Sequence, residues 1–327
     1  MTNNAMTILL LVVILLATAM LSLTMGELSF APSELWAILD GGSSMERGIL
    51  VHIRIPRTML AFAVGGSLSL CGVILQGIYR NPLVEPYTLG ISGGACFGIT
   101  LAIITGMNAV GRFVMPAMGF AGALAAIVLV YTLSLGRGVV SVSRMLLIGV
   151  MVSFICSALV MFLMSVTAVE NIPGIVFWTM GSLNESDEVM VNGIVVLSLT
   201  LLALSYLFAI PLNALRMGEY KARHLGINTA VVVRVLFVLT SLLTGSCIAV
   251  AGVIGFVGLI IPHLARLMVG SDYRMLLITS FLGGSIFLMI CDMAARWVIA
   301  PNELPIGVIT GIFGGIAFIV IMRRKWI

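Results

Sequence analysis

Long apolar segments recur along this chain, and they constrain its fold more than any other feature. A run of about 20 apolar residues is long enough to span the hydrocarbon core of a bilayer. In lipid every backbone N–H and C=O must be paired within its own segment, so each span is predicted to be a helix. The sequence therefore predicts an all-α polytopic membrane protein. Ten spans are expected, at residues 6–25, 58–79, 88–106, 113–135, 145–166, 190–210, 230–250, 256–268, 274–298 and 305–322.

Composition supports a membrane location. Of the 327 residues, 61% are hydrophobic and only 9% are charged, whereas a soluble domain carries about a quarter charged residues. The net charge of +4 comes without the dense basic patch that nucleic-acid binding requires, so no nucleic-acid partner is expected. The five cysteines lie in apolar segments without a CxxC pair, which is typical of small buried side chains.

The distribution of basic residues predicts the orientation of the spans. Arg323, Arg324 and Lys325 place the C-terminus in the cytoplasm, and an even number of spans then places the N-terminus there too. Residues 6–25 are expected to be the first span rather than a signal peptide, because no basic residue precedes them and no A-x-A-like site follows. The prediction is a multi-pass protein of the inner membrane with both termini cytoplasmic.

A weak internal repeat divides the chain. Gly72-Val73-Ile74 recurs 180 positions later as Gly252-Val253-Ile254, and Pro82 and Gly90 match Pro262 and Gly270 at the same offset. Five spans on each side require the halves, about 1–185 and 186–327, to be inverted within one transmembrane domain, 1–327, an architecture common in transporters. Chance similarity between Gly-rich apolar segments is the alternative.

Three connections are longer than simple turns. Residues 26–57 form an external loop in which Pro32 and the acid after it indicate the start of a short helix. Residues 167–189 suggest a short interfacial helix on the outer face, and residues 211–229 form a charged cytoplasmic loop.

The sequence contains no motif for ATP binding or hydrolysis that could drive transport. No GxxxxGK[ST] motif occurs, so the chain is not expected to hydrolyse ATP, and no catalytic or metal-binding constellation is visible. Within the spans the ionisable residues are Asp292, Arg296 and Arg234. Asp292 and Arg296 are four residues apart and can pair on one helix face. An ion-coupled secondary transporter, which needs an ionisable group in the membrane, is the alternative of another class.

Several motifs resemble the permeases of the iron-chelate, haem and cobalamin ABC importers, and they follow in the family's order along nearly the whole chain. The motifs are Arg54-Ile55-Pro56-Arg57, Gly65-Gly66, Gln76-Gly77, Arg80-Asn81-Pro82-Leu83, the run from Leu89 to Ala95, the run from Gly252 to His263, Asp292 to Arg296, and Glu303 to Gly307.

The resemblance implies a type II ABC importer permease fold and a set of partners. These are a second copy of the permease in a homodimer, two cytoplasmic ATPases that use ATP and Mg, and a periplasmic substrate-binding protein. No cofactor or metal is expected in this chain, which would be a transport subunit and not an enzyme. A ferric siderophore is the expected substrate, with cobalamin or haem as alternatives.

The resemblance also assigns candidate sites. Gly218, Glu219, Ala222, Leu225 and Gly226 resemble the coupling helix that docks on the ATPase; the alternative is a solvated basic loop. Arg54, Arg57 and Arg296 resemble residues that pair with carboxylates of the binding protein, where a guanidinium can grip both oxygens; the alternative is interfacial anchors. Ser141, Val142 and Ser143 resemble the cytoplasmic gate; the alternative is an ordinary loop.

Overall fold

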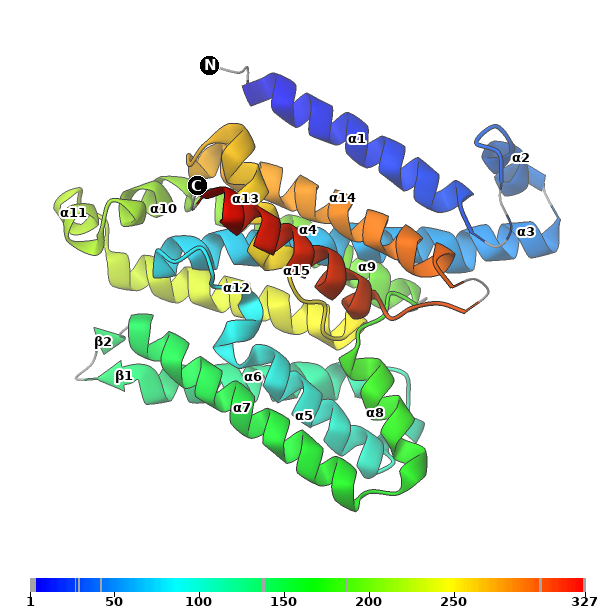
Figure 1. Cartoon of the computed structure of the whole chain (residues 1–327), viewed down its shortest axis with the longest axis horizontal. Coiled ribbons are helices and arrows are strands. Elements are labelled where there is room, and N and C mark those ends of the chain that lie inside the picture. The colour runs from blue at the N-terminus through cyan, green and yellow to red at the C-terminus, as the bar shows by residue number, and fades with distance from the viewer. Residues whose placement is uncertain are drawn as a thin grey trace.

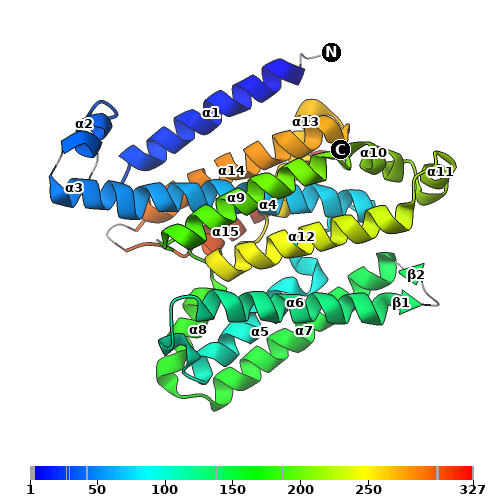
Figure 2. The same ribbon diagram turned by 180° about the vertical axis from the view of Figure 1, so that it is seen from behind.

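A computed structural model describes residues 4–26, 28, 30–41, 43–136, 139–140, 142–185, 187–299 and 302–325. Ten helices fall on the ten predicted spans, and Figures 1 and 2 show them packed in one bundle. The expectation of an all-α polytopic fold is confirmed. The ten are α1 (Asn4–Thr24), α4 (Ile55–Tyr79), α5 (Ile91–Ile104), α6 (Val114–Ser134), α7 (Val142–Val166), α9 (Glu188–Tyr206), α12 (Thr229–Ala251), α13 (Val257–Val269), α14 (Tyr273–Trp297) and α15 (Ile306–Lys325).

Shorter elements connect these helices. They are α2 (Glu34–Gly41), α3 (Ser44–Ile49), the π-helical turn η1 (Leu50–Arg54), the 3₁₀ turns η2 (Pro86–Leu89), η3 (Met107–Ala109) and η4 (Val169–Asn171), the ribbon strands β1 (Leu135–Gly136) and β2 (Val139–Val140), α8 (Ile172–Thr179), α10 (Ala209–Arg216) and α11 (Glu219–His224). The interfacial helix expected within residues 167–189 is α8.

The helices α5 and α13 are too short to cross a bilayer alone. Seven helices of the described chain have the length and apolarity to cross, whereas α5 has 14 residues and α13 has 13, which is about 20 Å of helix. Helix α5 follows the 3₁₀ turn η2, and α13 follows the irregular residues 252–256; these two connections meet where the Ile254 backbone N–H donates to the Tyr87 hydroxyl at 3.0 Å. Backbone of this kind is tolerated at membrane depth because protein surrounds it.

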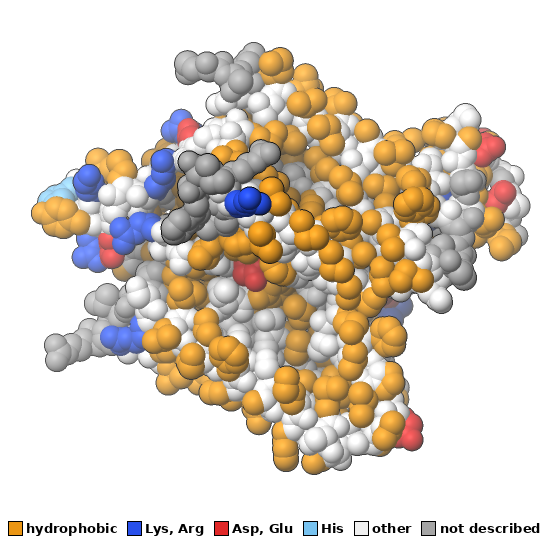
Figure 3. All heavy atoms as spheres, viewed as in Figure 1, with side chains coloured by type: hydrophobic (Ala, Val, Ile, Leu, Met, Phe, Trp, Pro, Cys, Tyr) orange, Lys and Arg blue, Asp and Glu red, His pale blue; other side chains and the backbone are white. Residues whose placement is uncertain are grey.

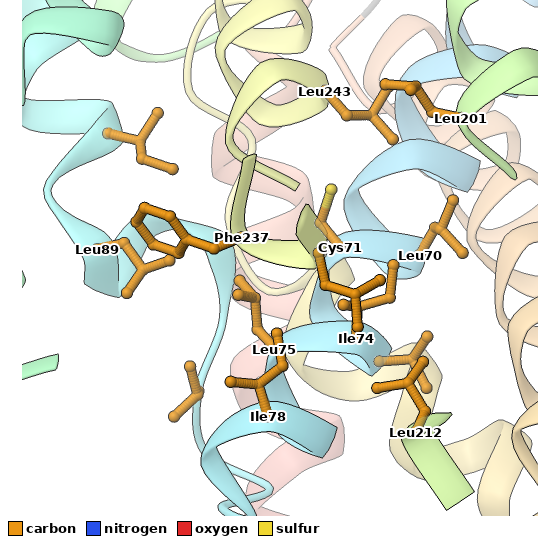
Figure 4. Packing of buried hydrophobic residues seen from close by; sticks show 14 of the residues in the cluster. Leu70, Cys71, Ile74, Leu75, Ile78, Leu89, Leu201, Leu212, Phe237 and Leu243 are labelled. Carbon is orange, nitrogen blue, oxygen red and sulfur yellow. The ribbon is translucent and has the colours of Figure 1, made fainter. Parts of the chain in front are cut away.

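Helix α4 forms the centre of the bundle. From Leu60 to Ile78 every residue except Phe62 is buried. Figure 4 shows Leu70, Ile74 and Ile78 of this helix among buried side chains from several other elements. A helix that is apolar on all sides and fully surrounded by protein is expected to be the core of a large bundle.

Glycines let other helices approach α4 closely. Gly72 faces Gly258 of α13, and Gly65 faces Gly284 of α14; a methyl group at any of these positions would overlap the backbone of the facing helix. Small residues at helix crossings are the usual means of close packing in membranes.

Gln76 compensates for a proline inside α13. Pro262 has no N–H, so the carbonyl of Gly258, four residues earlier, has no partner within its own helix. The Gln76 side-chain amide of α4 donates to that carbonyl at 3.2 Å and to Leu259 O at 3.4 Å. The break in the α13 ladder is therefore satisfied from a neighbouring helix.

The packing supports two related halves. Each half has a long helix, a short helix and two long helices, α4 to α7 and α12 to α15. In this correspondence α4, α5 and α6 match α12, α13 and α14. Helix α4 packs on α13 and α14, and α12 packs on α5 and α6, as expected if a two-fold axis exchanges the two sets. The division at residues 185 and 186 stays a prediction.

The residues whose identities match at an offset of 180 do not occupy equivalent positions in the structure. Gly72 lies inside α4, whereas Gly252 follows the end of α12 at φ +70°. Pro82 lies in a connection and Pro262 lies inside α13. The offset of 180 therefore pairs residues at different places in the two halves, because the connecting segments differ in length.

The two ends of the bundle differ in charge. Figure 3 shows Lys and Arg side chains gathered at the end that carries α10 and α11, with hydrophobic side chains covering the middle. We call this the basic end; β1 and β2 also lie there, and α2, α3 and α8 lie at the opposite end (Figures 1 and 2).

The external loop expected at residues 26–57 is shorter than predicted. Helical backbone runs without interruption from Met45 to Tyr79, so α3 and η1 extend α4 beyond the core. The short helix expected after Pro32 is α2. Its Leu35 and Ile38 pack with Phe30 and Leu50 in a small separate hydrophobic cluster, and this burial makes the region ordered helix instead of loop.

Candidate functional site

At the basic end, residues 209–226 form two short helices that project from the bundle. Ala222 of α11 is fully buried and anchors the segment, while the Tyr220 and Leu225 side chains are 76% and 62% exposed. Apolar side chains in contact with water on a charged surface are typical of a protein-binding site.

Gly226 ends α11 as the sequence predicted. It has φ +80°, its N–H donates to Arg223 O at 2.9 Å, and the next N–H, of Ile227, donates to Ala222 O at 3.1 Å. This is the Schellman pattern, in which a left-handed glycine pairs the last free carbonyls of a helix. At the start of α11 Gly218 has φ +110°, and Glu219 pairs with Arg223 at 2.6 Å. Backbone bonds at both ends thus fix the shape of this exposed segment.

The same segment is bonded to the start of α14. The Asn213 amide of α10 donates to the Asp272 carboxylate at 2.7 Å and accepts from the Tyr273 backbone N–H at 3.0 Å. Asp272 is the N-cap of α14 and accepts from the Arg274 N–H at 3.0 Å. The bond from Asn213, followed by that from Arg274, lowers the pKa of the Asp272 carboxyl below its usual value.

At the opposite end, α4 and α14 are joined by buried charges. Arg57 Nε donates to Asp292 Oδ1 at 2.7 Å, and Asp292 is 0% exposed. Arg57 NH1 also donates to Asn184 Oδ1 at 2.7 Å and to Glu303 Oε2 at 2.8 Å. Arg296 Nε lies 3.1 Å from Asp292 Oδ2, as an ion pair without the alignment of a hydrogen bond. We call Arg57, Asp292, Arg296, Glu303 and Asn184 the outer cluster.

Two arginines hold the end of α1. Arg54 NH1 donates to Leu23 O at 2.7 Å and to Thr24 O at 3.2 Å. Arg296 NH1 donates to Met25 O at 3.0 Å, and NH2 donates to Ser22 O at 3.3 Å. The last carbonyls of a helix have no partner within it and carry partial negative charge. Arg54 and Arg296 supply both the donors and the charge, and so attach α1 to the bundle.

Comparisons with known proteins agree with this architecture. The family model described as the FecCD transport family matches residues 13–324. The chain belongs to the FecCD transport family. It is 35% identical over 321 residues to the hemin transport system permease protein HmuU of Yersinia pestis, covering 96% of this chain and 94% of that protein. It is also 35% identical to the vitamin B12 import system permease protein BtuC of Salmonella paratyphi A, covering 95% of each.

A solved structure shares the fold over nearly the whole chain. An inward-facing conformation of a putative metal-chelate type ABC transporter superposes with a TM-score of 0.88, at 32% identity, covering 97% of this chain and 98% of that one. The resemblance stated from the sequence is therefore confirmed: this FecCD chain is a membrane-embedded permease of the ABC importer class.

The arginines predicted to dock a binding protein are already engaged within this FecCD chain. Arg54 is 5% exposed and Arg57 is also buried, so neither presents a free guanidinium. The pairing of Asp292 with Arg296, expected from their spacing of four residues, is confirmed. A pocket of about 270 Å³ opens over Arg57, lined by Phe177, residues 181–184 and residues 303–306. Docking stays a prediction, and of the three arginines only Arg57 lines this pocket.

The predicted gate falls partly outside the described residues. Ser141 is not described, and α7 begins at Val142, whose side chain is likewise outside the description. Ser143 is exposed in the first turn of α7, next to the β1–β2 ribbon at the basic end.

Sequence reasoning missed the partners of Arg54 and Arg57. Asn184 and Glu303 come from two separate connections, and their meeting with Arg57 depends on long-range packing. The only sequence feature that pointed to Glu303 is the Glu303-Leu304-Pro305 motif, which supports the family resemblance but assigns no function to Glu303. The role of Gln76 was likewise invisible until α13 was placed against α4.

Proposed function

We propose that this chain is the permease subunit of a binding-protein-dependent ABC importer that carries a ferric siderophore across the inner membrane by ATP-driven alternating access. The observation that carries the proposal is the capped, exposed segment at residues 209–226, which is bonded directly to α14. Such a segment suits a docking ATPase, because a displacement at the surface is passed to a membrane-spanning helix.

ATP hydrolysis belongs to a separate partner in this proposal. Two cytoplasmic ATPases dock on the α11 segment through Gly218, Glu219, Leu225 and Gly226, while the buried Ala222 anchors that segment, and two copies of the chain form a homodimer around the substrate path. The basic end then faces the cytoplasm, as the positive-inside rule favours. Co-purification of an ATPase with the wild-type chain, and its loss on replacing Leu225 with Glu, tests this arrangement. An intact complex in the variant would show that the docking surface lies elsewhere.

The binding protein docks at the opposite end, around Arg54, Arg57 and Arg296. Since Arg57 is held by Glu303 and Asn184, a carboxylate of the binding protein reaches it by displacing Glu303, which is 40% exposed. Contacts of this exposed kind contribute mainly to orientation and association rate.

The gate of the permease is assigned to Ser141, Val142 and Ser143 at the basic end. Small residues there suit close approach between two copies of the chain. Cross-linking of a Ser143→Cys variant between copies, present in one nucleotide state and lost in another, tests the assignment.

The identity of the substrate is the most specific part of the proposal. The relatives include proteins named for hemin and vitamin B12, and the matched structure is titled for a metal chelate. All three are large metal-bearing chelates, so the class is well supported, and haem or cobalamin is the alternative to a siderophore. Titrating the cognate binding protein with ferric siderophores, haem and cobalamin decides among them; tight binding of cobalamin or haem alone overturns the siderophore assignment.

The energy source can be tested independently of the substrate. The permease and its ATPase are reconstituted in proteoliposomes, and the binding protein with its chelate is added outside. Uptake of the chelate is measured with and without ATP inside the vesicles. Uptake that needs ATP and survives an ionophore supports the proposal. Uptake that ignores ATP and collapses with the ionophore means an ion-coupled secondary transporter instead.

A further inference from the structure

An apolar groove of about 330 Å³ runs along the surface between α6 and α12. The two helices lie side by side in Figure 2 and pack on each other. Nearly all of the lining is apolar, and the exposed side chains include Leu124, Val128 and Val238. The full lining is Phe120, Ala123, Leu124, Ile127, Val128, Tyr131, Arg234, Phe237, Val238, Ser241, Leu242 and Gly245.

The groove contains a single cation, Arg234. Its side chain is exposed, and it forms none of the ion pairs found in the described part of the chain. Arg57 and Arg296 behave differently, since both are paired with Asp292. An unpaired cation next to lipid is costly unless an anion or water reaches it.

The depth of Arg234 fits the level of a lipid headgroup. It lies five residues after Thr229, the first residue of α12, and so about 7.5 Å along the helix from the basic end. An arginine side chain can extend over that distance toward the membrane surface. The groove continues along α12 from Arg234 to Gly245, a further 16 Å or so into the bilayer.

We propose that this groove binds an anionic phospholipid of the leaflet at the basic end. The lipid phosphate pairs with the Arg234 guanidinium, which can hold two phosphate oxygens at once. One acyl chain lies in the groove between α6 and α12, against Leu124, Val128 and Val238. Charge complementarity decides the occupant: a neutral apolar helix would fill the groove but leave Arg234 without a counter-charge.

The test uses the full chain in nanodiscs of phosphatidylcholine and phosphatidylglycerol, with native mass spectrometry to measure retained lipid. Arg234→Gln removes the charge, and Arg274→Gln is the matched control, because Arg274 is exposed near the same end but does not line the groove. We expect phosphatidylglycerol to bind the wild type and the control equally and Arg234→Gln about fivefold more weakly, since one basic residue near an anionic surface contributes about 1 kcal/mol. Equal retention by Arg234→Gln and the control overturns the proposal.

A photo-cross-link identifies the occupant directly. With benzoylphenylalanine in place of Val238, which is 56% exposed in the groove, we expect an adduct with the mass of one lipid. An adduct between two copies of the chain would mean that the groove is a dimer contact, and the proposal would be wrong. Glycerol phosphate in solution should leave retention unchanged; displacement by it would mean that the site takes a free phosphate ester and not a lipid.

Discussion

Replacing Arg57 separates a structural role from a docking role. If Arg57 served only to dock a partner at the surface, Arg57→Gln would leave stability unchanged, and the lost contact would be worth about 0.2–1 kcal/mol of affinity. In the structure, Arg57 is the hydrogen-bond donor to Asp292 Oδ1 at 2.7 Å, and Asp292 is 0% exposed. Removing one partner of a buried pair costs about 3–5 kcal/mol, because the other charge stays buried.

We expect the lower part of that range for Arg57→Gln. Arg296 still lies 3.1 Å from the other oxygen of Asp292, so the carboxylate keeps some compensation. Equilibrium unfolding in mixed detergent micelles measures the change, and Arg47→Gln, an exposed arginine of α3 at the same end, is the control. Replacing both partners with apolar residues, Arg57→Met with Asp292→Leu, should recover part of the loss, because the buried carboxylate is removed and Arg296 keeps its bonds to the carbonyls at the end of α1.

The refuting result is specific. If Arg57→Gln unfolds at the same point as Arg47→Gln while binding of the periplasmic protein falls, the arginine is a docking residue and the burial argument fails. If stability and binding both fall, binding must be measured again in the double variant, where the fold is partly restored without the guanidinium.

Three further predictions test the packing and the basic end. Gln76→Leu should lower the free energy of unfolding by about 1–3 kcal/mol, because the Gly258 carbonyl is left buried without a donor; detergent unfolding measures it. Gly226→Ala should weaken ATPase co-purification through about 1–2 kcal/mol of strain at φ +80°; a pull-down measures it, and unchanged binding would contradict the capping role. Asn213→Ala should have a lower melting temperature than the wild type at pH 7, and this difference in melting temperature should shrink as pH falls below about 4. The pKa of Asp272 is lowered in the folded chain, so its stabilisation exists above the unfolded pKa and is lost on acidification; a gap that widens in acid would contradict the assignment.

The helices of this protein could be predicted from sequence because few backbone conformations are possible for an apolar segment in lipid. Ten apolar segments became ten helices, and the Gly226 cap followed from a local rule. The extension of α4 through η1 was not predictable, since it depends on Leu35 and Ile38 packing against Leu50. Local pattern determines what a segment can become, and contacts with distant segments determine how far it extends.

The arginines show the same limit for function. A charged residue just outside an apolar run is expected to be exposed, and this rule predicts exposed side chains for Arg54 and Arg57. Their partners are the final carbonyls of α1 and a carboxylate more than 200 residues away in sequence from Arg57. No spacing rule connects such groups, because the connection is made by the close packing of α4 on α14.

Helix α14 joins the two candidate sites. At its first turn, Asp272 and Tyr273 are bonded to Asn213 of the exposed segment at the basic end. At its other end, Asp292 and Arg296 belong to the outer cluster. Tyr273 and Asp292 are 19 positions apart along one uninterrupted helix, about 28 Å. Gly284 lies directly against Gly65 of α4, so the middle of α14 cannot bend toward α4 without a clash. We expect a displacement applied at Asn213 to be carried along α14 to Asp292, which Arg57 bonds to α4.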